Sequence, residues 1–408
     1  MGSELIVGLD IGTSAIKVAV ARSRGGRPVL TALFKDVSDG LRKGAIVDLA
    51  STTSSVAKVL GEIKKASKSA LKTVYVNIGT PQIRTQNSRG IVAVSRADSE
   101  IYEDDVERAI KASQAVAIAP NRMIVHNITR EYVVDGVGDI IDPLGLSGNR
   151  LEVNSLIIDA FAPHVKSIMR TVELAGGRIG GLVCDPLVAQ RAALSKSQKD
   201  LGVVLVDIGY GTTAMTVYDE NKIAGVSVFP VGAGNITNDI AVGLKIPVPA
   251  AESIKLQYGH ALAKDIGSKE NIDLSKFSSE SRGLVSRRFL SEIIESRLAE
   301  IFEFINNELR LGGKIGNLAG GVVLVGGGAK LPGLTELAKQ ELKLSSQIGL
   351  PLHEQWSEEA LNFVDAFEDP EYINALGLIL WGADKEGWLP KQGGRKFAFK
   401  NIIRYFLP

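Results

Sequence analysis

Residues 5–20 read LIVGLDIGTSAIKVAV, and this stretch carries the strongest indication of the fold. An apolar run leads into Asp10, Gly12 and two hydroxyl residues, and a β-branched run follows. Such an order predicts a β-hairpin with a glycine-containing turn. Residues 203–218, VVLVDIGYGTTAMTVY, repeat the same order about half a chain later. A repeat of this period is too long for a solenoid, so it predicts two related domains.

The bulk composition is that of a folded protein with more than one domain. The chain has 408 residues, of which 45% are apolar and 23% charged, and this length exceeds one ordinary core. The net charge of +1 argues against a strongly basic nucleic-acid-binding protein, so we expect no nucleic-acid partner. Cys184 is the only cysteine, which excludes an internal disulfide and a cysteine-cluster zinc site.

The sequence gives no sign of a segment that crosses a membrane. The N-terminus enters the first strand without a basic region and a long apolar run, so we expect no signal peptide. No stretch reaches the ~18 uninterrupted apolar residues of a spanning helix. We therefore expect any contact with a membrane to lie at its surface.

Strands and helices alternate along the rest of the chain, which predicts an α/β fold. Apolar periodicity predicts helices over residues 51–69, 102–117, 165–175, 286–311 and 334–342, and strands over residues 73–78, 90–94, 153–160 and 320–325.

The two hairpins have the residues that a phosphate group and its metal ion require. Glycines let backbone N–H groups crowd around a phosphate, and hydroxyl groups add donors. Mg²⁺ on a phosphate takes one or two carboxylates and otherwise keeps water; Asp10 and Asp207 each end a strand just before the turn. One such hairpin is a weak signal, whereas two in one chain favour a phosphate site.

A third segment, VVLVGGGAKLPG at residues 322–333, is a predicted strand that ends in three glycines. Backbone without side chains would let a flat ring lie against Gly326, Gly327 and Gly328. The alternative is a tight turn into the helix that follows. Together with the hairpins, the segment predicts a nucleotide cleft.

The order of these three segments resembles the superfamily of actin, Hsp70 and the sugar kinases. The resemblance implies an actin-like, ribonuclease H-like duplicated fold, with two lobes around ATP and Mg²⁺. The hairpins would be the two phosphate loops, and the glycine segment the adenosine loop. Residues 185–190 and 375–378 match the two connecting helices. Because Asp185 stands where many relatives carry Glu, we assign no catalytic residue; Gln190 could orient a water molecule.

Several longer segments resemble the FtsA family of bacterial cell division proteins. They are RGIVAVSR (89–96), EYVVDG (131–136), DPLGLSGNRLE (142–152), GAGNITNDIAVG (232–243), AESIK (251–255) and IIESRLAEIF (293–302). The resemblance implies domain 1A at residues 1–84 and 163–195, with an inserted 1C or SHS2 domain at 85–162. It implies domain 2A at residues 196–231 and 308–385, and a smaller domain 2B at 232–307.

The residue chemistry and the resemblance together predict the binding site. The resemblance implies that Glu252 and Lys255 lie near the nucleoside, although a solvated helix face would give the same pattern. The predicted ATP-binding residues are Gly12, Thr13, Ser14, Lys17, Gly209, Tyr210, Gly211, Thr212, Thr213, Gly232, Gly234, Glu252, Lys255, Gly326, Gly327, Gly328 and Ala329, and the predicted Mg²⁺ ligands are Asp10 and Asp207.

The C-terminal residues have the composition of a membrane anchor. Residues 386–396 are rich in glycine and predict a flexible linker. On a helical wheel, residues 397–408 divide into an apolar half and a basic half, as in interfacial helices that bind anionic lipid. The alternative is a helix docked on the protein's own core, but the linker favours the membrane. The predicted membrane residues are Phe399, Lys400, Ile402, Ile403, Arg404, Phe406 and Leu407.

The resemblance to the FtsA family implies a function in cell division. Such a protein would tether the FtsZ ring to the cytoplasmic face of the cell membrane at the septum. Its domain 2B would bind the C-terminal peptide of FtsZ, and ATP would favour self-association into filaments, with slow or absent hydrolysis. Other division proteins would be further partners. The alternatives are a PilM-like scaffold of type IV pilus assembly, which the opening of the first hairpin also resembles, and a sugar kinase, for which no segment clearly supplies a base.

Overall fold

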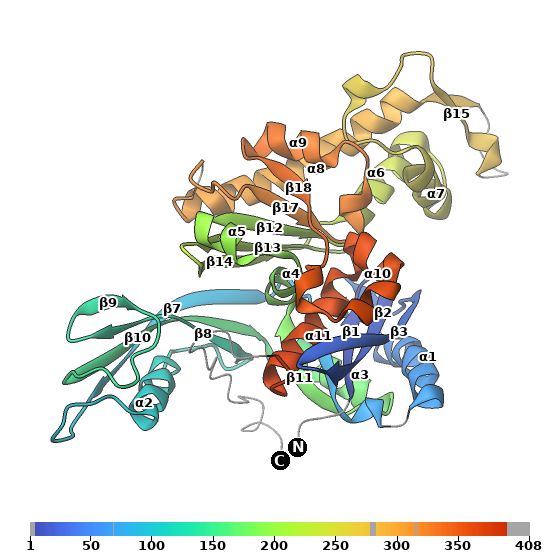
Figure 1. The fold of residues 1–408 in the computed structure, drawn as a ribbon. Coiled ribbons are helices and arrows are strands. Elements are labelled where there is room, and N and C mark those ends of the chain that lie inside the picture. Colours follow the sequence, from blue (N-terminus) through green and yellow to red (C-terminus); the bar gives the residue numbers. More distant parts are fainter. Residues whose placement is uncertain (1–4, 68, 278–282, 315, 390–408) are drawn as a thin grey trace.

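The computed structural model describes residues 5–67, 69–277, 283–314 and 316–389. Two lobes lie one above the other in Figure 1, each built on a five-stranded sheet, and a smaller domain projects from the lower lobe.

Both five-stranded sheets have the same topology. The first has the order β11-β6-β1-β2-β3. The second, written in the matching direction, has the order β18-β17-β12-β13-β14. In each, a central strand is antiparallel to the hairpin strand that follows it and parallel to its other neighbour. The strands of the first sheet are β1 (Leu5–Ile11), β2 (Ala15–Arg24), β3 (Arg27–Val37), β6 (Val74–Ile78) and β11 (Ile179–Cys184), and those of the second are β12 (Val203–Ile208), β13 (Thr213–Asp219), β14 (Lys222–Phe229), β17 (Val322–Val325) and β18 (Ser346–Ile348). The predicted duplicated α/β fold is confirmed.

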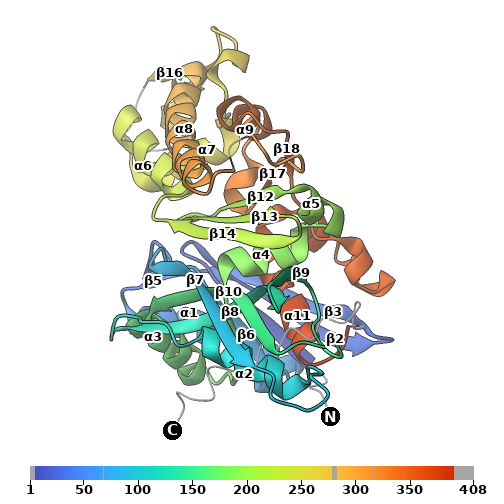
Figure 2. The same ribbon diagram turned by 90° about the vertical axis from the view of Figure 1, so that its left-hand side faces the viewer.

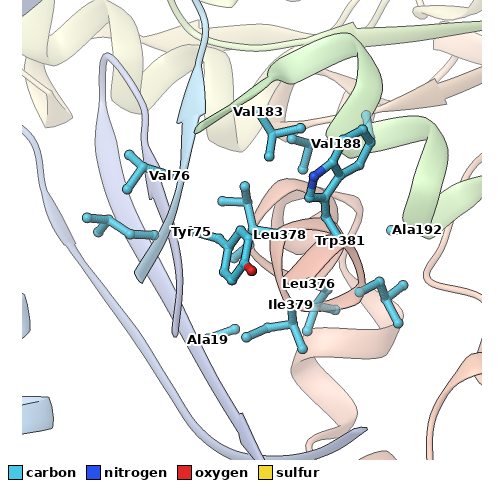
Figure 3. Packing of buried hydrophobic residues seen from close by; sticks show 14 of the residues in the cluster. Ala19, Tyr75, Val76, Val183, Val188, Ala192, Leu376, Leu378, Ile379 and Trp381 are labelled. Atoms are coloured by element: carbon cyan, nitrogen blue, oxygen red, sulfur yellow. The ribbon is translucent and has the colours of Figure 1, made fainter. Parts of the chain in front are cut away.

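Two helices cross between the sheets and connect the lobes. They are α4 (Asp185–Ala193) and α11 (Ile373–Lys385). Their backbones approach so closely that a Cβ on Gly377 would lie 2.3 Å from the carbonyl oxygen of Val188, so glycine is required at the crossing. Figure 3 shows Leu378, Ile379 and Trp381 of α11 packed between the first sheet and α4. This apolar layer fixes how the two lobes meet.

Amphipathic helices cover the outer faces of the sheets. α1 (Leu49–Ala66) and α3 (Ala162–Leu174) bury their apolar sides in the core of the first lobe. α8 (Arg287–Leu311) and α9 (Leu334–Leu342) do the same in the second lobe. α1 begins where the Asp48 carboxylate accepts from the backbone N–H of Ala50 and Ser51, an N-cap that ends the preceding loop.

The remaining helices and strands complete the two lobes. α6 (Ala233–Leu244), α7 (Val248–Tyr258), β15 (Asn271–Asp273) and β16 (Leu284–Ser286) pack around α8 at the upper right of Figure 1. α5 (Lys196–Leu201) precedes β12, and α10 (Val364–Glu368) precedes α11. β4 (Leu41–Arg42) and β5 (Ala45–Ile46) form a small hairpin in the first lobe.

The projecting domain has its own sheet and its own core. An antiparallel sheet of order β7-β10-β8-β9 carries one helix, as Figure 2 shows from its open side. Its core consists of Val94, Ile101, Ala109, Tyr132, Val134, Leu151 and Val153. The elements are β7 (Ile83–Ala93), α2 (Glu103–Ser113), β8 (Arg122–Val134), β9 (Val137–Ile140) and β10 (Arg150–Phe161). The insertion lies between β6 and α3 of the first lobe, yet Arg130 donates to the carbonyl oxygen of Ala224 in the second lobe (2.8 Å).

The chain is still folded where the linker was predicted to begin. Trp388 donates its backbone N–H to the carbonyl oxygen of Ala383 (2.8 Å) and its side chain is buried in the core of the first lobe. The prediction that residues 386–389 belong to a flexible linker is therefore wrong, and the rest of the predicted linker, residues 390–396, lies outside the described residues. The predicted membrane helix, residues 397–408, lies outside the described residues.

Candidate nucleotide-binding site

The turns of the two hairpins are built alike. Strand pairing ends at Ile11 and Ile16 in the first and at Ile208 and Thr213 in the second, so each turn has four residues. In the first turn, Gly12 donates its backbone N–H to the carbonyl oxygen of Ala15 (3.1 Å). In the second, Gly209 donates to Thr212 in the same way (2.9 Å). The duplication therefore extends to the hydrogen bonding of the turns.

The two turns meet across the cleft. A Cβ on Gly211 would lie 2.5 Å from Oγ1 of Thr13 and 3.0 Å from its Cβ. The same hydroxyl oxygen accepts from the backbone N–H of Gly44 (3.0 Å), which fixes the Thr13 side chain. The close approach of the lobes thus depends on glycine at position 211.

A cavity of about 750 Å³ opens between the lobes beside these turns. This volume is in the range of small-molecule sites in proteins. Of the predicted site residues, its lining includes Asp10, Gly12, Thr13, Ser14 and Lys17 from the first lobe, and Asp207, Gly209, Tyr210, Gly211, Thr212, Glu252, Lys255, Gly326, Gly327 and Gly328 from the second.

Four predicted residues do not line the cavity. The Thr213 hydroxyl is fully buried and donates to the carbonyl oxygen of Val231 (2.8 Å). Gly232 and Gly234 lie under the second turn, where a Cβ would meet the Gly209 carbonyl or the Tyr210 ring. Ala329 is buried in the core of the second lobe. These residues shape the wall rather than face the cavity.

The carboxylate of the first hairpin has a cation of its own. Asp10 lies opposite Lys17 in the strand register, and its Oδ2 accepts from Nζ of Lys17 (2.7 Å) while its Oδ1 accepts from Nδ2 of Asn77 (3.0 Å). Burial opposes the charge on Lys17, but the Asp10 carboxylate outweighs it and raises the pKa of Lys17. The first hairpin therefore brings a buried ion pair to the cleft.

The carboxylate of the second hairpin has none. Asp207 lies opposite Ala214, and its Oδ2 accepts from Nδ2 of Asn374 (2.8 Å). Among the described residues, no cation forms an ion pair with it. Burial raises the pKa of Asp207 to about 6, although the hydrogen bond from Asn374 opposes this shift.

A third carboxyl group lies at the base of the cleft. Asp185 begins α4 and lines the cavity, and its Oδ1 is buried without a hydrogen-bond partner in the described chain. Burial, and then the charges of Asp10 and Asp207, raise the pKa of Asp185 well above its usual range. The hydrogen bond from Asn77 and the charge of Lys17 oppose this shift, and a cation near the three carboxyl groups would favour their ionised forms.

The carboxylates suit a metal that is held mainly by phosphate and water. Within the described ranges, no group of three or more His, Cys, Asp or Glu side chains is close enough to hold a metal ion alone. Mg²⁺ in nucleotide sites takes one or two carboxylates, substrate phosphates and several waters. Asp10 and Asp207 fit this ligand set.

The three glycines of the segment all line the cavity, and they differ in what surrounds them. Gly326 has φ +84° and a Cβ there would lie 2.2 Å from Oδ1 of Asp207, while a Cβ on Gly328 would lie 2.4 Å from Cγ2 of Ile208. These two glycines therefore make room for the end of β12. At the middle residue of the three, Gly327, a Cβ would meet no atom within 4 Å, so it is the one that leaves open space for a ring.

A polar pair on α7 forms part of the cavity wall. Nζ of Lys255 donates to Oε2 of Glu252 (2.7 Å) and to Oγ1 of Thr237 (2.9 Å), and lies 5.5 Å from the centre of the Tyr210 ring. Burial lowers the pKa of Lys255. The pair is thus held at the cavity rather than on a solvated helix face.

Sequence reasoning missed several residues of the cleft. Asn77 and Asn374 hold the two carboxylates but come from β6 and α11, far from either hairpin. Lys330 follows the glycines and lines the cavity, where it pairs with Glu371 (3.2 Å). Its position directly after the glycine segment could have identified it as a site residue. The idea that Gln190 orients a water molecule is wrong, because its amide is buried between the Leu187 carbonyl and the Tyr218 hydroxyl.

Known proteins match both the sequence and the fold. A sequence model described as "Cell division protein FtsA" matches residues 204–377, and one described as "SHS2 domain inserted in FTSA" matches residues 81–159. Cell division protein FtsA of Bacillus subtilis is 34% identical over 98% of this chain and 87% of its own. That of Pseudomonas aeruginosa is 33% identical over 94% and 90%.

Among solved structures, the PilM-PilN type IV pilus biogenesis complex has a TM-score of 0.65 at 19% identity and covers 93% of this chain and 98% of its own. MreB 5 of Spiroplasma citri bound to AMPPNP has a TM-score of 0.52 at 13% identity, with 93% and 96% covered.

Two like sheets, crossed helices and paired turns at one cleft define an actin-like protein, and these structures share that fold. The sequence relatives then fix the family within this class. The chain belongs to the FtsA family of cell division proteins.

Proposed function

We propose that the cleft binds ATP together with Mg²⁺. The observation that carries this proposal is the pair of equivalent glycine turns, each directly after a buried aspartate, that meet at one cavity. The turns offer backbone N–H groups to phosphates, and Lys17 adds a positive charge. Asp10 and Asp207 would hold Mg²⁺, which would neutralise phosphate charge between the lobes. Gly327 and the Glu252–Lys255 pair lie where they could contact the nucleoside.

The nucleotide proposal is tested by calorimetry with ATP and ADP in the presence of Mg²⁺. Asp207→Ala removes a predicted metal ligand. Gly327→Glu fills the cavity from a position where a Cβ meets no atom, so the fold should survive. We expect both variants to lose binding at least tenfold, and wild-type affinity in both would contradict the site.

We propose further that the protein tethers the division ring to the membrane. Membership of the FtsA family supports a role in division, and the amphipathic composition of residues 397–408 supports a surface anchor on the cytoplasmic face. Anchoring by one short helix is weak, so self-association into ATP-favoured filaments would strengthen it through many copies. Within the described part of the chain, no helix is long and apolar enough to cross a membrane.

The anchor is tested with a truncation placed by the structure. Removal of residues 390–408 leaves Trp388 in the core, whereas a cut after Glu386 would remove it. We expect the shorter chain to stay in the supernatant with anionic liposomes, while the full chain sediments. A double variant, Ile402→Asp with Phe406→Asp, should behave like the truncation, and Asn401→Asp is the control.

The partner proposal is that domain 2B, around residues 232–307, binds the C-terminal peptide of FtsZ. A pull-down should compare this peptide with one from a type IV pilus assembly protein, since the PilM complex shares the fold. Retention of the FtsZ peptide alone is the expected result. Retention of only the pilus peptide would contradict the proposal.

A further inference from the structure

Asn374 occupies a special place at the start of a connecting helix. It is the second residue of α11, three residues before Gly377, which packs against Val188 of α4. Asp185 lies three residues before Val188 on α4. Asn374 and Asp185 thus each lie three residues before the contact between the two helices, and both line the cavity.

The amide of Asn374 is only half satisfied. Its Nδ2 donates to Oδ2 of Asp207 (2.8 Å), and the orientation is fixed because an ionised carboxylate can only accept. Its Oδ1 is buried without a hydrogen-bond partner in the part of the chain that the structure describes. A buried acceptor without a donor is costly, and a ligand that brings a donor into the cavity would remove this cost.

The asparagine that bonds the aspartate of the first hairpin, Asn77 of β6, behaves differently. Asn77 also donates to an aspartate, since its Nδ2 bonds Oδ1 of Asp10 (3.0 Å). Its Oδ1, however, already accepts from the backbone N–H of Ile11 (2.7 Å). Asn77 is complete without a ligand, whereas Asn374 is not. The difference is therefore specific to the second hairpin, whose carboxylate forms no ion pair with any residue that the structure describes.

We propose that Asn374 is a positioning residue that aims the Asp207 carboxylate at Mg²⁺ and accepts a hydrogen bond from a water molecule of the ion's shell. The inference rests on the proposed binding of ATP with Mg²⁺. Magnesium in such sites keeps several waters, and each supplies the O–H donor that Oδ1 lacks. Residues that hydrogen-bond to metal ligands and orient them set metal affinity. Because Asn374 lies in the first turn of α11, it also connects the ion to a helix that packs on the first sheet.

The test separates metal-dependent from metal-independent binding of nucleotide. The affinity for ADP is measured by calorimetry in MgCl₂ and again in EDTA, for the full chain and for Asn374→Leu. We expect Mg²⁺ to strengthen the binding of ADP to the wild-type chain. In the variant, the gain in affinity from Mg²⁺ should be about tenfold smaller. Its affinity in EDTA should stay within about twofold of wild type, which a purely structural defect would not allow.

Two further variants keep the test decisive. Asn362→Leu makes the same change at an exposed position and should keep the full effect of Mg²⁺. Asn374→Ala replaces the leucine variant if that chain does not fold. Full strengthening by Mg²⁺ in the Asn374 variant would overturn this inference alone. Absence of nucleotide binding in the wild-type chain would instead overturn the proposed function.

Discussion

The two hairpins have the same backbone and opposite electrostatics. Each has a four-residue turn that a glycine closes, and each presents an aspartate at the end of its first strand. Opposite Asp10 the register places Lys17, and opposite Asp207 it places Ala214. The protein therefore supplies a counter-charge to Asp10, whereas Asp207 forms no ion pair with any described residue. The two hairpins thus share a backbone shape, and the residue opposite each aspartate, Lys17 or Ala214, makes their charges differ.

This difference assigns separate tasks to the two lobes. A buried ion pair such as Asp10–Lys17 is complete without a ligand and fixes the first turn. A buried carboxylate without a cation costs free energy until a metal arrives, so the second turn is the natural place for Mg²⁺ to bind. Binding of the ion would then favour the arrangement in which both turns meet the same phosphates.

The largest expected effect comes from breaking the ion pair of the first hairpin. Asp10→Asn leaves Lys17 buried without its counter-charge, and loss of one partner of such a pair typically costs about 3–5 kcal/mol. We expect the free energy of unfolding, measured in urea without nucleotide, to fall by about this amount. The matched variant Asp207→Asn should cause no loss, because the Asn374 hydrogen bond can remain. Equal destabilisation by both would mean that the hairpins are electrostatically alike.

The affinity for nucleotide should depend strongly on Asp207, whose replacement we expect to leave the free energy of unfolding unchanged. Asp207→Asn removes the charge that we assign to Mg²⁺, so we expect the affinity for ATP in MgCl₂ to fall about 100-fold, within the usual range for loss of metal-site interactions. In EDTA the same variant should bind ADP almost as well as wild type. Calorimetry at both metal conditions checks this, and a loss that is the same with and without Mg²⁺ would remove Asp207 from the metal site.

The pH dependence of the free energy of unfolding tests the charge of the second hairpin in the same way. The pKa of Asp207 is raised to about 6 from an ordinary value of 3.8, so between these values the folded chain holds a proton that the unfolded chain releases. Without ligand, this group therefore stabilises the fold below pH 4, and its contribution is lost as the pH rises through about 6. Urea unfolding should show this part of the pH dependence disappear in Asp207→Asn.

The affinity for Mg²⁺ and ATP should change with pH in the opposite direction, and rise as the pH rises. Binding needs the ionised carboxylate, and at pH 5 about nine-tenths of Asp207 is protonated if its pKa is about 6. We expect the affinity to fall about tenfold between pH 7 and pH 5 for this reason. Asp207→Asn is the control for titration of the nucleotide itself, and an identical pH profile in that variant would contradict the assignment.

The sequence was sufficient for the hairpins and insufficient for what surrounds them. Strand–turn–strand patterning is local, so the turns and both aspartates could be predicted. The pairing of Asp10 with Lys17 was also within reach, since a four-residue turn places those positions opposite each other. Asn77 and Asn374 could not be found, because they are 67 and 167 residues away from their partners and only the packing of β6 and α11 brings them near.

Two local features could not be predicted from residue type alone. Thr213 was assigned to phosphate for its hydroxyl, but it begins β13, and the pleat turns its side chain toward the core. Gly326 and Gly328 line the cavity, but a Cβ on either would also meet the end of β12, a second need for glycine that the sequence alone did not indicate. A residue type shows what chemistry is available, whereas the direction of its Cβ depends on tertiary packing.

The smallest expected effect tests the contact between the turns. Gly211→Ala places a Cβ 2.5 Å from Oγ1 of Thr13, and overpacking of this kind costs about 1 kcal/mol or more. Because this strain opposes the approach of the two turns, we expect it to weaken ATP binding roughly fivefold. Gly225→Ala, where a Cβ meets nothing within 4 Å, is the matched control. Adding Thr13→Gly should recover part of the affinity lost by Gly211→Ala; if the double variant binds no better, the turns do not meet in the bound state, and the two hairpins act on the nucleotide independently.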